Sequence, residues 1–231
     1  MDNKLTEAFR RIPLFAGLHQ EALQALSKLS PHQSFAAGEM MIGHRDQSFD
    51  VLFLVSGHAR VNIYSSAGKR VSFREIREGA IFGELSALDG CPRSASVEAV
   101  TPCSAIVLPR QAFLKTVREE PVFMLSVMVH LTTLVRLLTE RVFEFSTLAV
   151  RNRVHAELLR IAGDREGRNE ARISPPPTHE EIASRISTHR EAVTRELARL
   201  EEMGLILKEG RVLRIKDLAA LHRLVEQGTV D

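Results

Sequence analysis

Apolar residues recur at helical spacing near the start of the chain and at strand spacing in the segment that follows. Over residues 3–29 they lie three or four positions apart, which is typical of short amphipathic helices, and Pro13 interrupts the pattern. From about residue 33 to residue 108, short alternating or β-branched runs are separated by turn signals. Strands at this regular spacing predict a compact antiparallel β domain of barrel or jelly-roll type. The turn signals are Gly38, Ser56-Gly57, Ala67-Gly68, Glu78-Gly79 and Thr101-Pro102.

A long helix is predicted from Glu120 to about Ser146, where helical spacing returns. One set of its apolar residues is spaced alternately four and three apart, which is the repeat of a two-stranded coiled coil. A second apolar stripe runs beside this seam. We expect one side to pack on the β domain and the other to bind a second copy of the chain, with burial inside one subunit as the alternative. The seam is Met124, Met128, Leu131, Val135, Leu138, Val142 and Phe145, and the second stripe is Phe123, Val127, Leu134 and Leu137.

The apolar stretch at residues 121–139 is long enough to be considered as a membrane span. It contains Arg136, however, and a charged arginine near the centre of a bilayer costs about 2.5–3.5 kcal/mol. We therefore interpret the stretch as a helix of a soluble protein. The first residues lack the apolar core of a signal peptide, and Cys91 and Cys103 are too few for a disulfide framework. A reduced, cytoplasmic setting with no membrane partner is expected.

The second half of the chain predicts a smaller, largely helical domain. A hinge-like segment at residues 148–153 precedes an amphipathic helix over residues 154–162, and the polar run at 163–172 is expected to be a loop. Thr178 and Glu181 then have the spacing of a capping box, in which each side chain satisfies a free backbone donor of the other. This spacing marks the start of another helix.

A helix-turn-helix begins at this capping box. The first helix is expected to end at Ile186, and a tight turn at Ser187-Thr188 leads into a second helix from His189 to Met203. Two short β runs around Glu209-Gly210 predict a hairpin beside the helices, so the unit has the pattern of a winged helix. Such a wing would lie along the phosphate backbone of DNA. The basic residues near the hairpin are Lys208, Arg211 and Lys216.

The second helix of the pair has one polar and one apolar face when it is drawn at about 100° per residue. Arginine pairs bidentately with guanine and glutamate accepts from cytosine N4, so the polar face predicts readout of a G·C-containing step in the major groove. The alternative is a solvated face on which Glu191 pairs with Arg195. The polar face holds Arg190, Glu191, Thr194 and Arg195, and the apolar face holds Val193, Leu197 and Leu200.

Length and composition fit two folded domains. The 231 residues exceed the roughly 100–150 of a usual single domain, and the chain is 44% hydrophobic and 26% charged. The net charge is only +2, so any surface that binds nucleic acid must be local.

The stretch GELSALDGCPRSAS, residues 83–96, carries chemistry of a different kind. It follows a strand and reads as one short helical turn closed by Gly90. Gly83 would let a ligand approach the backbone, and Arg93 supplies the planar fork of donors that phosphate prefers, with Ser94 beside it. Phosphate would repel Glu84, so this carboxylate is expected to accept from sugar hydroxyls. Phosphate and ribose together indicate a nucleotide.

The run FGELSALDGCPRSASVEA strongly resembles the phosphate-binding cassette of cyclic-nucleotide-binding domains. With the coiled-coil helix and the winged helix-turn-helix behind it, the chain resembles the cyclic AMP receptor protein (CRP/FNR) family of bacterial transcription regulators over roughly residues 12–216. The resemblance implies an α+β fold. It would comprise an N-terminal antiparallel β-roll of jelly-roll type (1–119), a long dimerisation helix with a hinge (120–150) and a C-terminal winged helix-turn-helix (151–231).

The resemblance also implies an effector site. Gly83, Leu85 and Ser94 would line it around the cyclic phosphate, Arg93 would neutralise that phosphate, and Glu84 would hold the ribose 2′-hydroxyl. Family members that respond to cyclic AMP typically place two adjacent hydroxyl residues against the base. This chain has Leu138-Thr139 there, so only Thr139 offers a hydroxyl. Cyclic AMP is expected ahead of cyclic GMP, with no metal.

The resemblance implies three partners: a second copy of the chain, a twofold double-stranded DNA operator with TGTGA-like half-sites, and RNA polymerase. The base-reading residues would be Arg190, Glu191 and Arg195, and Ser187 stands where glycine is common in the turn. The full set expected to contact DNA is Thr188, His189, Arg190, Glu191, Thr194 and Arg195.

Other functions stay open at this point. Relatives with the same fold sense haem-bound gases or oxidants, or have no effector, and Cys91 could act as a redox-sensitive thiol. The scattered histidines give haem no clear ligand. A cyclic-nucleotide-binding subunit without DNA function is a further alternative. An enzyme is not expected, because the chain has no HExxH, GxSxG or Walker-type run.

Overall fold

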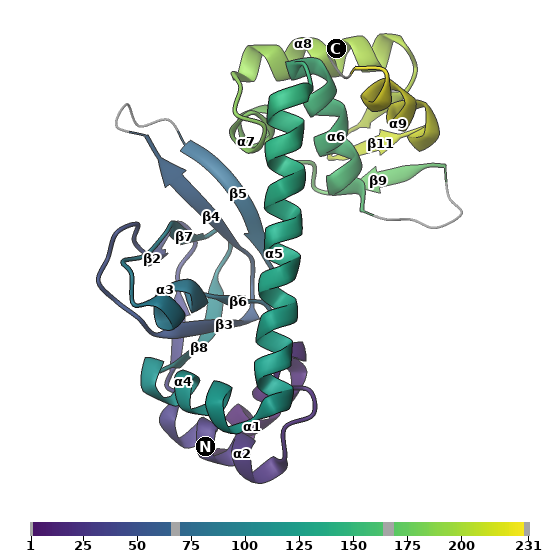
Figure 1. Cartoon of the computed structure of the whole chain (residues 1–231). Helices are drawn as coiled ribbons and strands as arrows, with labels where there is room; N and C mark the ends of the chain where they lie inside the picture. Colours follow the sequence, from purple (N-terminus) through teal and green to yellow (C-terminus); the bar gives the residue numbers. More distant parts are fainter. Residues whose placement is uncertain (1, 66–69, 164–168, 229–231) are drawn as a thin grey trace. The chain divides into compact units, whose positions relative to one another are not determined.

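The computed structural model describes residues 2–65, 70–163 and 169–228 (Figure 1). The chain divides into two compact units, residues 1–135 and residues 136–231. The turn expected at Ala67-Gly68 lies outside the described residues, as do residues 164–168 of the expected loop.

Unit one is a β-roll with helices at its start and end. Two short helices and a 3-10 turn come first: α1 (Asp2–Arg11), η1 (Pro13–Phe15) and α2 (Gln20–Leu29). The strands form two four-stranded antiparallel sheets, in the orders β1-β8-β3-β6 and β2-β7-β4-β5, which confirms the predicted antiparallel roll. The strands are β1 (His32–Phe35), β2 (Met40–Ile42), β3 (Val51–Ser56), β4 (Ala59–Tyr64), β5 (Arg70–Ile76), β6 (Ile81–Phe82), β7 (Ser96–Ala99) and β8 (Cys103–Leu108).

An aromatic cluster joins the helices of unit one to the roll. The ring of Phe15 lies 4.7 Å from that of Phe9, 4.8 Å from Phe53 on β3 and 5.1 Å from Phe123, between ring centroids. Phe123 lies in the first turn of the long helix α5 (Pro121–Thr147), whose first half belongs to unit one. Each fully buried phenylalanine contributes about 1.5–3 kcal/mol. The cluster therefore fixes the start of α5 against the roll.

One helix of unit one was not foreseen from the sequence. The cassette turn is α3 (Glu84–Asp89), which was expected, but α4 (Arg110–Glu119) was assigned to no element. Its buried Phe113 packs edge-on against Phe123 with ring centroids 5.8 Å apart. This long-range contact stabilises α4.

The described residues of unit two form the end of α5, four further helices and a small sheet. The sheet is antiparallel in the order β10-β11-β9. The hairpin β10–β11 and both helices of the predicted helix-turn-helix are present. The elements are α6 (Val150–Ala162), β9 (Ala171–Ile173), α7 (His179–Arg185), α8 (Arg190–Glu202), β10 (Ile206–Glu209), β11 (Val212–Ile215) and α9 (Leu218–Glu226).

Two expectations for this unit were wrong in detail. The hinge-like segment is mostly helical, because α6 begins at Val150 and only Leu148 and Ala149 separate it from α5. The end of the expected loop is strand β9, whose Ala171 and Ile173 are buried while Arg172 between them is exposed. Pairing with β11 stabilises this short strand, and that pairing leaves no periodic signal in the sequence around it.

The turn of the helix-turn-helix carries backbone strain. The capping box is formed as predicted: Glu181 N donates to Thr178 Oγ1 at 3.2 Å, and Thr178 N donates to Glu181 Oε2 at 2.8 Å. At the other end of α7, Ser187 has a φ of +54°, which is in the left-handed region. A non-glycine residue there costs about 1–3 kcal/mol.

Replacing Ser187 by glycine should relieve this strain. We expect Ser187→Gly to raise the free energy of unfolding by about 1 kcal/mol. The additional conformational entropy that glycine loses on folding reduces this gain. Thermal unfolding followed by circular dichroism should then shift upward by about 2–4 °C. Ser187→Ala keeps the β-carbon and should bring no gain, so an equal gain in both variants would contradict the strain.

Candidate functional site

The cassette is built around a buried guanidinium. Arg93 is 3% exposed and donates from Nε to Ser48 Oγ at 2.9 Å, from Nη1 to the Gly83 carbonyl at 2.8 Å and from Nη2 to the Asp50 carbonyl at 2.7 Å. Burial lowers the pKa of Arg93, and nearby carboxylates oppose that shift. A guanidinium has five N–H donors. The contacts within the described residues thus leave one donor on each terminal nitrogen for an anion.

Gly83 is needed for a reason that the sequence did not suggest. Its φ is +83°, and a β-carbon there would lie 2.7 Å from Arg93 Nη1 and 3.0 Å from the Asp50 carbonyl oxygen. The sequence interpretation attributed this glycine to the approach of a ligand. In the structure, it lets the guanidinium and the neighbouring backbone come close.

Glu84 follows Gly83 and is a buried carboxylate, 3% exposed. It lies 3.2 Å from Nε2 of His130 on α5, measured from Oε1. Its charge also acts on two arginines, because it opposes the burial that lowers the pKa of Arg74 and of Arg93. The structure thus brings Gly83, Glu84 and Arg93 together, and joins them to α5 through His130.

Sequence reasoning missed His130 as a site residue. A signal was available, because His130 stands three residues after Val127 and so falls on the stripe that was expected to be apolar. A polar residue on a buried stripe needs a partner. Only the fold shows that the partner is Glu84.

The remaining predicted effector residues are not all gathered by the structure. Leu85 and Ser94 are exposed within the cassette segment of unit one. Thr139 and Leu138 are exposed on the part of α5 that belongs to unit two.

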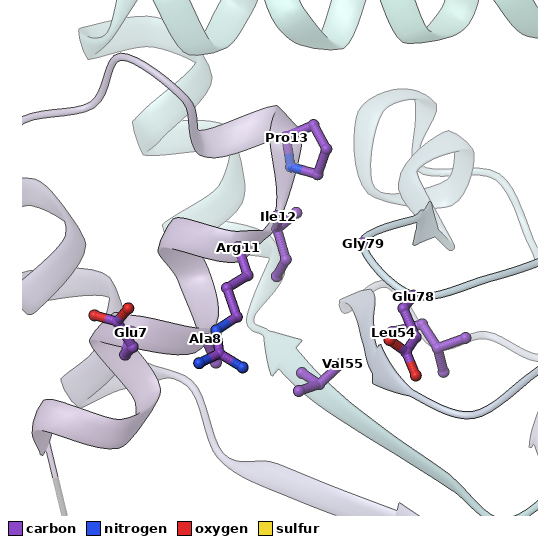
Figure 2. A pocket seen from close by; sticks show the side chains of 9 residues that line it. All are labelled: Glu7, Ala8, Arg11, Ile12, Pro13, Leu54, Val55, Glu78 and Gly79. Atoms are coloured by element: carbon purple, nitrogen blue, oxygen red, sulfur yellow. The ribbon is translucent and has the colours of Figure 1, made fainter.

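A cavity of about 470 Å³ lies in another part of unit one, between α1 and the end of β3 (Figure 2). None of the predicted effector residues lines it. Its walls are Glu7, Ala8, Arg11, Ile12, Pro13, Leu54, Val55, Glu78 and Gly79.

The polar face of α8 is exposed as predicted. Arg190, Glu191, Thr194 and Arg195 are all exposed, and His189 precedes the helix as its N-cap. Thr194 is held from two sides: its hydroxyl donates to the Arg190 carbonyl at 3.0 Å and lies 2.7 Å from Nδ1 of His179. Thr188 is half-buried in the turn. The apolar face, Val193, Leu197 and Leu200, is buried in the core of the unit.

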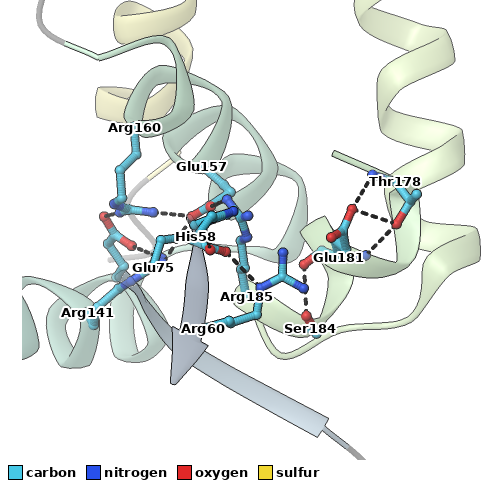
Figure 3. Close-up of polar contacts among 11 residues, drawn as sticks. His58, Arg60, Glu75, Arg141, Glu157, Arg160, Thr178, Glu181, Ser184 and Arg185 are labelled. Carbon is cyan, nitrogen blue, oxygen red and sulfur yellow. Dashed lines mark hydrogen bonds and ion pairs between the residues drawn. The ribbon is translucent and has the colours of Figure 1, made fainter. Parts of the chain in front are cut away.

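A second buried carboxylate connects three helices of unit two. Figure 3 shows Glu157 of α6 among arginines from α5, α6 and α7. Arg141 of α5 lies 3.1 Å away, Arg185 of α7 lies 3.3 Å away, and Arg160 of α6 also pairs with it. Glu144 of α5 pairs with Arg141 and Arg160 and extends the network. These five residues form the Glu157 cluster, which connects the end of α5 to the helix-turn-helix.

The predicted seam of α5 is largely uncovered. Leu131 is half-buried, and the other six members are between 37% and 64% exposed. On the second stripe, Phe123 and Val127 are buried in unit one. By length and composition alone α5 could cross a membrane, although core helices of soluble proteins pass the same test.

Comparisons with known proteins agree with this geometry. The family model for a cyclic nucleotide-binding domain matches residues 32–120, and that for a Crp-like helix-turn-helix domain matches residues 152–224. The chain is 26% identical over 222 residues to a CRP-like cAMP-activated global transcriptional regulator of Mycobacterium tuberculosis, covering 95% of this chain and 99% of that one. It is 27% identical over 217 residues to the cyclic AMP receptor protein of Thermus thermophilus, covering 92% and 96%.

A solved structure confirms the fold. A CooA mutant from Carboxydothermus hydrogenoformans superposes with a TM-score of 0.75 at 21% identity, covering 86% of this chain and 88% of that one. The domains and the fold define a DNA-binding transcription regulator with a cyclic nucleotide-binding domain. The chain belongs to the CRP/FNR family of transcription regulators. Its relatives above are regulators rather than enzymes, and the described residues contain no group of three or more His, Cys, Asp or Glu placed to hold a metal.

The Glu157 cluster gives a prediction about stability. In Glu157→Gln, Arg141, Arg160 and Arg185 lose a buried negative charge, and breaking a buried ion pair costs about 3 kcal/mol or more. Urea unfolding followed by circular dichroism should show this loss. Glu170→Gln serves as the control, because the exposed pair of Glu170 with Arg214 should matter little. Equal stability of both variants would show that the cluster contributes nothing.

Proposed function

We propose that this chain is a homodimeric regulator whose DNA binding is controlled by a cyclic nucleotide held at the cassette, cyclic AMP ahead of cyclic GMP. The observation that carries the proposal is the presence of a buried guanidinium, Arg93, and a buried carboxylate, Glu84, at one glycine: Arg93 donates to the Gly83 carbonyl and Glu84 follows Gly83. These groups fit the ligand. The nucleotide supplies an anionic phosphate and a ribose hydroxyl, for which Arg93 offers free donors and Glu84 an acceptor.

Support for the effector also comes from the relatives, whose names describe activation by cyclic AMP or its reception. Thr139 would form a hydrogen bond with the base, whereas Leu138 has no hydroxyl to do so. The preference for one base is therefore expected to be weaker than in a site with two adjacent hydroxyl residues. Ser94 and Leu85 would complete the site. The redox alternative would depend on Cys91, which is exposed in the cassette loop. The names of the relatives favour a nucleotide over this alternative and over haem.

Within each unit, polar contacts support a route for the response. In unit one, Glu84 meets His130, so the cassette touches the helix that carries the seam. In unit two, the guanidinium of Arg153 lies over the ring of Phe145, the last seam residue, at 5.4 Å from its centroid. Arg153 also donates to the Ile186 carbonyl, at the end of α7, at 3.1 Å. A repacked seam would therefore move the turn of the helix-turn-helix. The effector can shift the equilibrium between the two states by no more than the difference in its binding free energy for them.

We divide the chain for this purpose into an effector domain (1–119), a dimerisation helix with hinge (120–150) and a DNA-binding domain (151–231). The partners would be a second copy, a twofold operator with TGTGA-like half-sites about one helical turn apart, and RNA polymerase. Regulators of this kind act in the cytoplasm. Arg190, Glu191 and Arg195 would read bases. Thr188, His189 and Thr194 would support them, and Lys208, Arg211 and Lys216 would lie near phosphates.

Effector binding can be tested with calorimetry on the wild type and on Glu84→Gln, using cyclic AMP, cyclic GMP and 2′-deoxy cyclic AMP. The variant should lose about tenfold or more in affinity for cyclic AMP, because the ribose 2′-hydroxyl then donates to a neutral amide in place of a carboxylate. Its loss of affinity for the 2′-deoxy analogue, which lacks that hydroxyl, should be much smaller. Glu119→Gln, exposed on α4, is the matched control. No binding of any of the three nucleotides to the wild type would refute the effector assignment.

Arg93→Ala is the less informative variant, because it also removes three structural contacts, to Ser48, Gly83 and Asp50. A loss of binding in that variant would not separate a lost phosphate contact from a collapsed cassette. Glu84→Gln keeps shape and hydrogen bonding while removing the charge.

Dimerisation through the seam can be tested at Val142, which is 64% exposed. Val142→Glu would place two carboxylates face to face in the seam, so the protein should sediment as a monomer at micromolar concentration while the wild type is a dimer. Thr133→Glu, exposed on the opposite side of α5, should stay dimeric. A monomeric wild type would remove the dimer from the proposal.

DNA reading can be tested with Arg195→Ala on a twofold TGTGA-like duplex. Loss of a bidentate base contact should weaken binding by about tenfold or more per half-site and relax the preference at that base. Arg223→Ala on α9 removes the same charge away from the reading face and should bind as the wild type does. Equal weakening by both variants would indicate general electrostatics in place of base reading.

A further inference from the structure

One more buried carboxylate lies on the reading helix itself. Glu196 follows Arg195 on α8 but faces inward, and its Oε1 lies 2.6 Å from Nε2 of His155 on α6. His155 is 2% exposed and Glu196 is 8% exposed. The pair therefore connects α6 with α8 inside unit two, on the side of α8 away from Arg190 and Arg195. The other oxygen of Glu196, Oε2, lies 3.7 Å from Arg199 of the same helix.

The hydrogen bond has only one possible direction. An ionised carboxylate only accepts, so His155 must carry its proton on Nε2. Nδ1 of His155 is buried and has no hydrogen-bond partner among the described residues. Burial lowers the pKa of His155, the contact with Glu196 opposes the shift, and the charges of Arg199 and Arg151 add to it. The geometry therefore places the proton of this hydrogen bond on Nε2.

Such a pair is a poor device for stability alone. Buried polar pairs can often be replaced by apolar residues without loss of stability, and here a ring nitrogen is left without a partner. What the pair adds is direction. The hydrophobic attraction that buries Val193, Leu197 and Leu200 is non-directional, whereas a short hydrogen bond has a preferred angle.

The angle matters for the outer face of α8. Side-chain atoms lie about 5–6 Å from a helix axis, so a rotation of about 20° moves them by about 2 Å. Hydrogen bonds to base edges tolerate only about 0.5 Å. A reading helix that turned this far about its axis would lose its base contacts while keeping its general attraction to phosphate.

We propose that His155 is a positioning residue for DNA reading: it holds Glu196 and thereby sets the rotation of α8 about its axis. The inference rests on the proposed reading face of Arg190, Glu191 and Arg195. If His155 no longer donates to Glu196, discrimination between DNA sequences should fall, while the affinity for non-specific DNA should stay unchanged.

The test measures binding of the full chain, with saturating cyclic AMP, to a TGTGA-like twofold duplex and to a scrambled duplex of equal length. In His155→Leu, the ratio of the two dissociation constants should fall about tenfold, as for one lost base contact, with the scrambled duplex bound as before. His155→Gln places an amide N–H near the former Nε2 and should restore most of the ratio. If His155→Leu does not fold, His155→Asn provides the loss, because its shorter amide does not reach Glu196.

An unchanged ratio in the folded loss variant, or an equal loss on both duplexes, would overturn the proposal. A wild type that does not discriminate between the duplexes would instead refute the reading face. A second measurement therefore uses no DNA. Long-range ¹H–¹⁵N NMR should show His155 as the Nε2–H tautomer, and hydrogen exchange along α8 should quicken in His155→Leu and slow again in His155→Gln. A proton on Nδ1, or equal exchange in all three proteins, would also overturn it.

Discussion

A buried carboxylate stays charged only where donors or cations surround it, and this constraint organises the whole chain. Glu84 contacts His130 of α5, and its charge interacts with the charges of Arg74 and Arg93. In unit two, Glu157 pairs with arginines and Glu196 is hydrogen-bonded to a histidine. In each case at least one partner comes from another element. The three carboxylates therefore connect the cassette to α5, α5 to α7, and α6 to α8, which are the joints that a regulated DNA-binding protein must control.

The apolar cores have a different part. In unit one, the phenylalanine cluster holds the first half of α5 against the roll, and in unit two an aliphatic cluster holds the helix-turn-helix together. These contacts supply most of the stability but little direction, because the hydrophobic effect is non-directional. Packing makes each unit rigid, while the polar pairs determine how its helices are turned. The seam of α5 is apolar yet exposed, so its burial is left to a partner chain in the proposed dimer.

The comparison with relatives distinguishes the fold that they share from the contacts that are described in this chain. The fold is kept at 21% identity in a solved structure, and the regulators from Mycobacterium tuberculosis and Thermus thermophilus match this chain nearly end to end. His130, His155 and the Glu157 cluster lie outside the motifs by which the sequence resembles the family. Function resides in sites built on a shared scaffold, and the differences between members are expected at such supporting contacts.

The sequence by itself determined the elements whose signals are local. Strand alternation, the heptad seam, the capping box at Thr178 and the two faces of α8 were all predictable, because each depends on residues a few positions apart. Only the tertiary structure decided α4, β9, the role of Gly83 beside Arg93, and the pairing of Glu84 with His130. These depend on contacts between residues far apart in the chain. A periodic pattern shows that a side chain is buried, but which partner it meets there is decided by the packing of other elements.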